Sequence, residues 1–266
     1  MGGMTGSLLL LLLAGVSVST MVDLQKRIIH GHDCNNNERQ YHVQLNIKTQ
    51  TGRALCGASL ISDQWILTAR HCWEPGETIS AILRVHPHGN EITETINLNN
   101  IHQYDKADIM LLKLTTPRPG FIQIALPDCV NHPTPKNVMV QIAGHGAITA
   151  APDKTRTPYR VPDLKCADIK VNNCPGVKKY DELFCGKTTD KTSPVDSCLG
   201  DSGGGVVYKE WIYGVISRGH QKACTGPDKY VGVCGYMSWI TSITGITTSK
   251  PPKNILNRVR NVFKSG

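Results

Sequence analysis

The stretch DSCLGDSGG, residues 196–204, decides how the rest of this chain is interpreted. It places Ser202 between glycine residues and directly after Asp201. Glycine lets the backbone bend, and lets it approach a substrate, where a side chain would clash. The backbone amides of Gly200 and Ser202 can then point to one spot, an arrangement that stabilises a developing oxyanion. Taken alone, the stretch is also compatible with an ordinary acidic turn.

Two earlier segments remove that ambiguity, because they supply a histidine and an aspartate in a fixed order. They are LTARHC at residues 67–72 and DIMLLKL at residues 108–114, and RIIHG at residues 27–31 precedes both. With these motifs the chain resembles the trypsin/chymotrypsin-type serine proteases from about Ile28 to Thr247. The resemblance implies that Ser202 is the nucleophile, His71 the general base and Asp108 the group that orients the imidazole. It also implies that the amides of Gly200 and Ser202 form the oxyanion hole.

The pattern of apolar residues predicts an all-β fold, either a sandwich or a barrel. Short runs of alternating polarity, bounded by turn-forming residues, cover residues 41–47, 54–61, 65–68 and 81–85. The resemblance narrows the fold to two six-stranded Greek-key β-barrels with a short C-terminal helix, which we expect from Tyr236 to about Thr247. A chain of 266 residues is long enough to bury such a core without the help of a metal.

Four regions are predicted along the chain: a signal peptide (1–19), an activation propeptide (20–27), a trypsin-like peptidase domain (28–247) and a basic C-terminal extension (248–266). The apolar run in the first region is too short to span a bilayer, although an uncleaved anchor is the alternative. Of the formal net charge of +8, the extension contributes +5 and residues 1–27 contribute +1, which leaves +2 for the domain. The extension has helical spacing of apolar residues between basic ones. It is either a solvated or docked segment, or a ligand for anionic surfaces such as membranes or sulfated glycans.

The two basic residues Lys26 and Arg27 before Ile28 predict a processing site. The resemblance implies that a cut after Arg27 frees the amino group of Ile28, which then pairs with Asp201. Such a buried ion pair exists only after proteolysis, so the chain is predicted to be a zymogen that an activating protease switches on.

The ten cysteines, together with a secretory start, predict disulfides and an extracellular location. The resemblance implies a complete set of pairs: Cys34–Cys166, Cys56–Cys72, Cys129–Cys234, Cys174–Cys185 and Cys198–Cys224. Val140 and Tyr208 occupy the two positions of a further bridge found in many relatives.

The specificity pocket is predicted from the same resemblance. Asp196 stands at its base, where a carboxylate attracts Arg or Lys, and Ser197, Ser217 and Gly219 contribute to its walls. Asp228 stands where trypsin-like enzymes carry glycine, so two carboxylates are expected to face one pocket, each raising the pKa of the other. This predicts either a stronger preference for lysine or slow cleavage of all substrates. Arg218 replaces an aromatic residue that usually contacts the substrate.

No cofactor and no metal is expected. Residues 86–88, HPH, lack a nearby carboxylate or cysteine, and every histidine other than His71 is expected to be a surface or hydrogen-bonded residue. Nucleic acid is not expected as a partner, because the protein is predicted to be secreted and its peptidase domain is nearly neutral. Expected partners are protein substrates, the activating protease and protein inhibitors of proteases, with the enzyme itself a monomer.

The sequence therefore predicts a secreted serine endopeptidase that cleaves after Lys or Arg through an acyl-enzyme intermediate. The alternative is a catalytically weak homologue that acts as an extracellular binding module. Its support is a group of departures from the family pattern at Arg70, Arg218, Asp228 and Gly205.

Overall fold

The computed structural model describes residues 28, 31–146, 153–154, 162–174, 182–189, 195–219, 222–223 and 225–248. The predicted signal peptide and propeptide, and residues 249–266 of the predicted extension, lie outside the described residues. Within the described ranges, no helix combines the length and the apolar character needed to cross a membrane.

The N-terminal sheet has the strand order β6-β5-β2-β3-β4-β8-β7. Its strands are β2 (His42–Lys48), β3 (Arg53–Leu60), β4 (Trp65–Thr68), β5 (Thr78–Leu83), β6 (Ile92–Thr95), β7 (Ile101–Gln103) and β8 (Met110–Lys113). The consecutive strands β6 and β7 are separated by a short turn that contains the 3-10 helix η2 (Leu98–Asn100). Because β6 pairs with β5 and β7 pairs with β8, the two strands together act as one interrupted strand that closes a barrel.

The C-terminal sheet has the order β1-β10-β11-β14-β13-β12-β9, and a further pairing of β9 with β10 closes it. Its strands are β1 (His32–Asp33), β9 (Met139–Gly144), β10 (Lys165–Asn172), β11 (Leu183–Lys187), β12 (Gly205–Tyr208), β13 (Trp211–Arg218) and β14 (Asp228–Gly232). Six strands form the ring, and β1 adds a seventh at its edge. The prediction of two barrels is confirmed; each sheet has seven strands instead of six because of β1 here and the interruption at η2 in the other barrel.

The C-terminal helix is shorter than the sequence predicted. The 3-10 helix η3 (Val233–Tyr236) leads into α1 (Met237–Thr244). Gly245 then adopts a left-handed conformation with φ of 69°, and its N–H donates to the carbonyl of Thr241. A glycine in this conformation is a common helix terminator, so the helix ends before the predicted Thr247.

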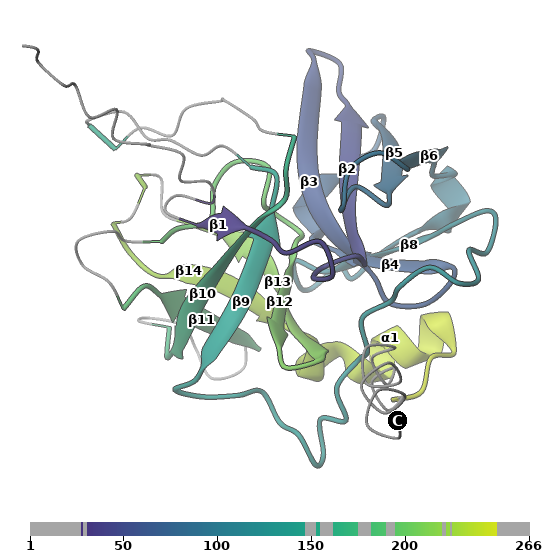
Figure 1. Cartoon of the computed structure of the whole chain (residues 1–266). Coiled ribbons are helices and arrows are strands. Elements are labelled where there is room, and N and C mark those ends of the chain that lie inside the picture. The colour runs from purple at the N-terminus through teal and green to yellow at the C-terminus, as the bar shows by residue number, and fades with distance from the viewer. Residues whose placement is uncertain are drawn as a thin grey trace, which may run out of the picture.

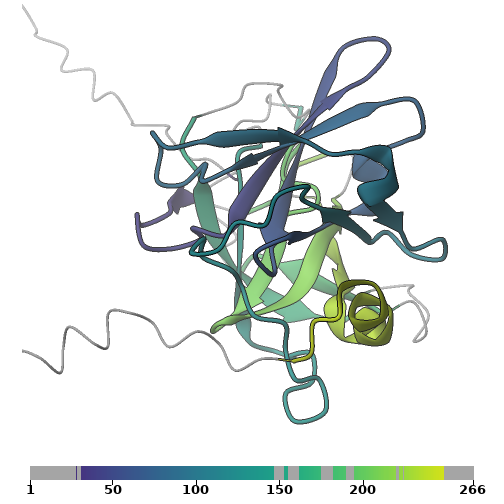
Figure 2. The ribbon, with the colours of Figure 1, turned by 90° about the vertical axis from the view of Figure 1, so that its right-hand side faces the viewer.

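The two barrels lie side by side (Figure 1), and one apolar cluster contains residues of both. In β2 the side chains alternate between buried and partly exposed, as expected for a strand with one face on the core. Apolar residues of both barrels and of α1 pack in the same cluster, among them Leu45, Val215 and Ile240. Figure 2 shows α1 next to the C-terminal strands, below the N-terminal barrel. This shared packing fixes the barrels relative to one another, which matters because residues from both approach one point.

Four of the predicted disulfides are formed: Cys34–Cys166, Cys56–Cys72, Cys129–Cys234 and Cys174–Cys185. For the fifth predicted pair, Cys224 lies outside the described residues, whereas Cys198 is buried. Val140 and Tyr208, which replace a bridge of many relatives, pack with the apolar core of the C-terminal barrel.

Candidate active site

The pairing of β4 with β8 brings His71 and Asp108 together. The strands are antiparallel, and Thr68 at the end of β4 lies opposite Met110 at the start of β8. The chain leaves β4 through the 3-10 helix η1 (Arg70–Cys72), which carries His71. Asp108 lies two residues before Met110, so the two side chains emerge at the same edge of the barrel.

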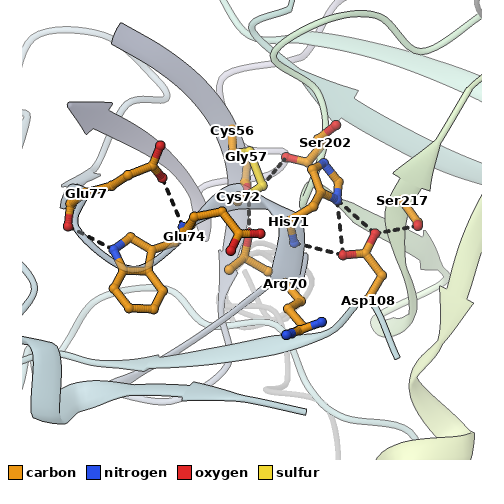
Figure 3. The surroundings of a disulfide bond; sticks show 12 residues. Cys56, Gly57, Arg70, His71, Cys72, Glu74, Glu77, Asp108, Ser202 and Ser217 are labelled. Carbon is orange, nitrogen blue, oxygen red and sulfur yellow. Dashed lines mark hydrogen bonds and ion pairs between the residues drawn. A yellow bond between two sulfur atoms is a disulfide. The ribbon is translucent and has the colours of Figure 1, made fainter. Parts of the chain in front are cut away.

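The carboxylate of Asp108 holds His71 through both its side chain and its backbone. His71 Nδ1 lies 2.8 Å from Oδ2 and 3.0 Å from Oδ1, and the His71 backbone N–H donates to Oδ1 at 2.9 Å. The hydroxyl of Ser217 donates to Oδ2 at 2.5 Å (Figure 3). Partial burial would raise the pKa of Asp108, but the hydrogen bonds from His71 and Ser217 outweigh it, and the net pKa is lowered. The carboxylate therefore stays ionised and fixes the imidazole with Nδ1 toward it.

Ser202 is attached to the other barrel and reaches the same place. Its carbonyl accepts the N–H of Gly57 in β3 at 2.7 Å, and it lies 3.7 Å from Sγ of Cys72, the residue after His71. Figure 3 shows Ser202 at the end of the imidazole that faces away from Asp108. Within the described residues, no hydrogen bond joins the Ser202 hydroxyl to His71. In unliganded enzymes such contacts often tighten only when substrate binds.

The Cys56–Cys72 disulfide determines whether the group of Cys56, His71 and Cys72 can bind a metal ion. Ligand atoms of Cys56, His71 and Cys72 lie within 4.8 Å of one another, a spacing that could suit a metal ion. The two sulfur atoms are bonded to each other at 2.01 Å. They therefore cannot act as thiolate ligands, and the bridge instead fixes η1 to β3.

The segment around Ser202 depends on glycine because it runs between the two barrels. Gly203 has φ of +83°, and a Cβ atom built on it would come within 2.2 Å of Thr68 Oγ1 and 2.3 Å of the Gly57 carbonyl. Gly200 has φ of +103°.

In the described part of the chain, the amides of Gly200 and Ser202 donate to no acceptor. Both N–H groups are thus available to a ligand.

Asp201 points away from the surface, into the C-terminal barrel, and is 0% exposed. Its Oδ1 accepts the N–H of Gly146 at 2.7 Å, and its Oδ2 accepts the N–H of Cys198 at 2.8 Å. Ile28 is also fully buried and packs in the apolar cluster of the same barrel. Arg27, the predicted processing residue, lies outside the described residues.

The two acidic residues of the predicted pocket lie together. Asp196 and Asp228 are 3% and 2% exposed and line the same cavity of about 70 Å³. The N–H of Ser197 donates to Asp228 Oδ2 at 2.9 Å. Burial, followed by the neighbouring Asp196, raises the pKa of Asp228 well above its usual value.

Among the other predicted pocket residues, Ser217 donates a hydrogen bond from its hydroxyl to Asp108, as described above. Gly219 follows the end of β13 and is exposed, as is Arg218 before it. The structure thus brings Asp196, Ser197 and Asp228 into contact and leaves Gly219 at the surface.

Comparison with known proteins agrees with this arrangement. A family model described as trypsin matches residues 28–240. The chain belongs to the trypsin family. Trypsin-1 of Salmo salar is 31% identical over 254 residues, which cover 89% of this chain and 97% of the salmon protein. The anionic trypsin of Canis lupus familiaris is 30% identical over 88% of this chain and 96% of its own.

Among solved structures, the mouse serine protease neuropsin has a TM-score of 0.64 and 22% sequence identity. The match covers 80% of this chain and 98% of neuropsin, and it supports the two-barrel fold. At the level of the trypsin family, these similarities indicate a serine endopeptidase that acts on protein substrates.

Sequence reasoning missed a group of buried histidines near this site. His42 and His145 are 3% and 5% exposed, and their ring centroids are 5.3 Å apart. His42 departs from the expectation of a surface or hydrogen-bonded histidine, because it is buried and its Nε2 has no partner within the described residues. His145 is hydrogen-bonded to the backbone of Pro162, as expected, but it is buried and its Nδ1 has no partner among the described residues. His86, also buried, is hydrogen-bonded to the carbonyl of Asn35 at 2.8 Å. The alternation of β2 gives no signal of this burial, because His42 precedes core-facing Val43 and therefore falls on the opposite face of the strand.

Proposed function

We propose that this member of the trypsin family is a secreted serine endopeptidase, made as a zymogen, that hydrolyses peptide bonds after Lys or Arg. The observation that carries the proposal is the hydrogen-bonded pair of His71 and Asp108 beside Ser202. In the proposed reaction, Ser202 attacks the carbonyl carbon of the substrate while His71 accepts its proton. His71 then returns the proton to the leaving amine, and water hydrolyses the acyl-enzyme in a second half-reaction.

Two features support stabilisation of the tetrahedral intermediate. The amides of Gly200 and Ser202 have no acceptor within the described residues, so they are free to donate to an oxyanion. Asp201 also anchors the segment that carries these amides, because its buried carboxylate accepts hydrogen bonds from the backbone N–H groups of Gly146 and Cys198. We propose that the new amino group of Ile28, produced by a cut after Arg27, joins Asp201 and completes this support.

The preference for a basic residue rests on the buried carboxyl groups of Asp196 and Asp228. A cationic side chain that enters the cavity meets a negative charge there, whereas an apolar side chain would leave that charge buried and unpaired.

The test compares three proteins: the parent, Ser202→Ala and Asp108→Asn. In each, the residues before Ile28 are replaced by the recognition sequence of a site-specific protease, which is removed after the cut. The proteins are then profiled on peptides that carry every residue before the cleaved bond. We expect the parent to cleave after Lys and Arg, Ser202→Ala to be inactive, and Asp108→Asn to lose about 10⁴-fold in kcat.

Arg70, Arg218 and Gly205 depart from the family pattern, so the experiment must also test the competing function, a catalytically weak binding module. If neither the parent nor Ser202→Ala cleaves any peptide, although both chains are folded and cut, the proposal is refuted in favour of a binding module.

A further inference from the structure

A second cavity lies where the end of β5 meets the segment that connects the two barrels. It has a volume of about 250 Å³ and is lined by residues that follow β5 and by residues 120–122, between β8 and β9. The side chains that line it include Gln40, Arg84, His86, Asn90, Phe121 and Ile122. Arg84, Asn90 and Ile122 are exposed, so a side chain of another protein can reach the cavity. None of the lining residues belongs to the proposed catalytic site or specificity pocket.

Arg84 supplies the charge of this cavity. It directly follows β5, and its φ of 57° is uncommon for a residue that has a side chain. Its guanidinium carbon lies 4.0 Å from the ring centroid of Phe121, which is the geometry of a cation–π contact. The ring covers one face of the guanidinium, and no described residue accepts a hydrogen bond from the Arg84 side chain. The N–H donors at the edge of the guanidinium are therefore available to a ligand.

The acidic side chains nearest to the cavity in the sequence do not neutralise Arg84. Glu91 accepts the N–H of Gly89 at 3.0 Å, and Glu38 accepts the N–H of Asn35 at 2.9 Å. Neither carboxylate forms an ion pair with Arg84, and no acidic residue is among the described lining of the cavity. The lining thus holds a positive charge without a counterion, and the complementary ligand is an anion.

The other lining side chains suit a carboxylate that is attached to an apolar group. The side-chain amide of Asn90 makes no hydrogen bond with the described residues and is a further free donor. Ile122 is 43% exposed, and together with Phe121 it gives the cavity an apolar wall. His86 Nε2 donates to the Asn35 carbonyl at 2.8 Å, because a carbonyl oxygen only accepts, and this bond holds the imidazole in place. A carboxylate with an apolar neighbour therefore matches the lining better than an isolated inorganic anion does.

The single cation favours one acidic side chain over a polyanion. A sulfated glycan carries closely spaced charges and is bound by clusters of Lys and Arg, whereas Arg84 is the one Arg or Lys in the described lining. An exposed ion pair usually contributes little, in part because both side chains must be ordered. Phe121 lowers that cost for Arg84, since the ring already holds the guanidinium in position.

We propose that this cavity is a secondary binding site for an acidic residue next to an apolar residue on a protein partner. The guanidinium of Arg84 pairs with the carboxylate, the amide of Asn90 donates to it, and the apolar side chain packs against Phe121 and Ile122. The site holds the partner and takes no part in the chemical step. It does not depend on the proposed peptidase activity, because its residues are separate from those of the catalytic site and the specificity pocket.

Titration followed by nuclear magnetic resonance measures this binding directly. The isotope-labelled Ser202→Ala protein is titrated with acetyl-Glu-Leu-amide and, as the neutral counterpart, with acetyl-Gln-Leu-amide. The measurement is made at low ionic strength, because salt screens exposed charges. We expect the Glu peptide to shift the backbone amide signals of Arg84, Asn90, Phe121 and Ile122. We also expect it to bind about fivefold or more tightly than the Gln peptide.

Three substitutions in the same background separate the ion pair from the overall charge and from the apolar contact. Arg84→Gln removes the guanidinium and should reduce the affinity for the Glu peptide to that for the Gln peptide. Arg53→Gln, at the exposed start of β3, is the matched control: it removes the same charge elsewhere and should leave the affinity unchanged. Ile122→Ser should weaken binding of the Glu peptide but not of acetyl-Glu-Gly-amide, because glycine has no side chain to pack.

Equal binding of the Glu and Gln peptides, or an affinity that Arg84→Gln leaves unchanged, would overturn the proposal. Binding of sodium sulfate as tightly as the Glu peptide would also overturn it, since the apolar wall would then contribute nothing. So would Arg84-dependent binding of a heparin oligosaccharide that is tighter than binding of the peptide. Each of these failures leaves the proposed peptidase activity untouched, because Ser202→Ala reports binding alone. A parent enzyme that cleaves no peptide would refute the proposed function without affecting this site.

Discussion

Acid should destabilise this protein through His145, and the structure allows the size of the effect to be worked out. His145 follows β9 and is buried next to His42. Burial, followed by the neighbouring His86 and His88, lowers its pKa from 6.5 to about 4, although Asp163 and a hydrogen bond with the backbone of Pro162 act in the opposite direction. The folded protein thus keeps this imidazole neutral at pH values where the unfolded chain protonates it.

The sign and magnitude follow from proton linkage. Between pH 6.5 and about 4 the unfolded state binds more protons than the folded state, so the free energy of unfolding falls as the pH falls through this window. A pKa difference of about 2.5 corresponds to roughly 3 kcal/mol. The contribution is fully present above pH 6.5 and lost near pH 4. The pKa of His42 is lowered in the same direction, again mainly by burial, so it adds to the effect.

The variant His145→Phe isolates this term, because it retains an aromatic ring but cannot titrate. Urea unfolding would be followed by tryptophan fluorescence at pH 7, 6, 5 and 4 in the Ser202→Ala background, which prevents self-digestion. Between pH 7 and pH 4, the variant should lose about 3 kcal/mol less stability than its parent. His32→Phe, at an exposed position of β1, is the control and should follow the parent profile. Identical pH profiles for His145→Phe and the parent would refute the reasoning.

Two further predictions concern the backbone and the disulfides. Gly203→Ala should destabilise the fold by about 3 kcal/mol or more, seen as a lower Tm, because the new methyl group meets Thr68 Oγ1 and the Gly57 carbonyl at a positive φ; an unchanged Tm would show that the segment can move. Replacement of both Cys34 and Cys166 by Ser removes a bridge between residues 132 positions apart and should cost about 2–5 kcal/mol in urea unfolding. A loss below 1 kcal/mol would mean that β1 and its pairing with β10 hold the segment without the disulfide.

The prediction that His71, Asp108 and Ser202 share one site came from the resemblance of their motifs to a known family, not from strand pairing. The structure adds the physical reason why His71 and Asp108 meet. Thr68 opposite Met110 is enough to place His71 beside Asp108. The four cysteine pairs that the structure confirms were also predicted from the resemblance, since each cysteine is matched to the family by its neighbours in the chain. Local rules also located β4 without error.

What the sequence could not predict depends on contacts between distant loops. The burial of His42 and His145 arises where β2, β9 and the turn at His86 converge, and no local pattern reports that convergence. Ser217 was assigned to the pocket wall, and the hydrogen bond from its hydroxyl to Asp108 was not predicted. The burial of Asp196 and Asp228 at one cavity could be suspected from two acidic residues assigned to one pocket. That Oδ1 of Asp228 is buried without a hydrogen-bond partner among the described residues depends on atomic positions.

The contact between Gly57 and Gly204 limits how this protein can be re-engineered. A Cβ atom on Gly57 would come within 3.0 Å of both Cα and N of Gly204, so the two barrels meet here backbone against backbone. A library of variants aimed at new substrates should therefore leave this seam untouched, since even a methyl group on Gly57 would require the backbone at Gly204 to shift. Diversity is better placed at exposed positions such as Leu199 and Arg218, where a change of side chain does not alter the distance between the barrels.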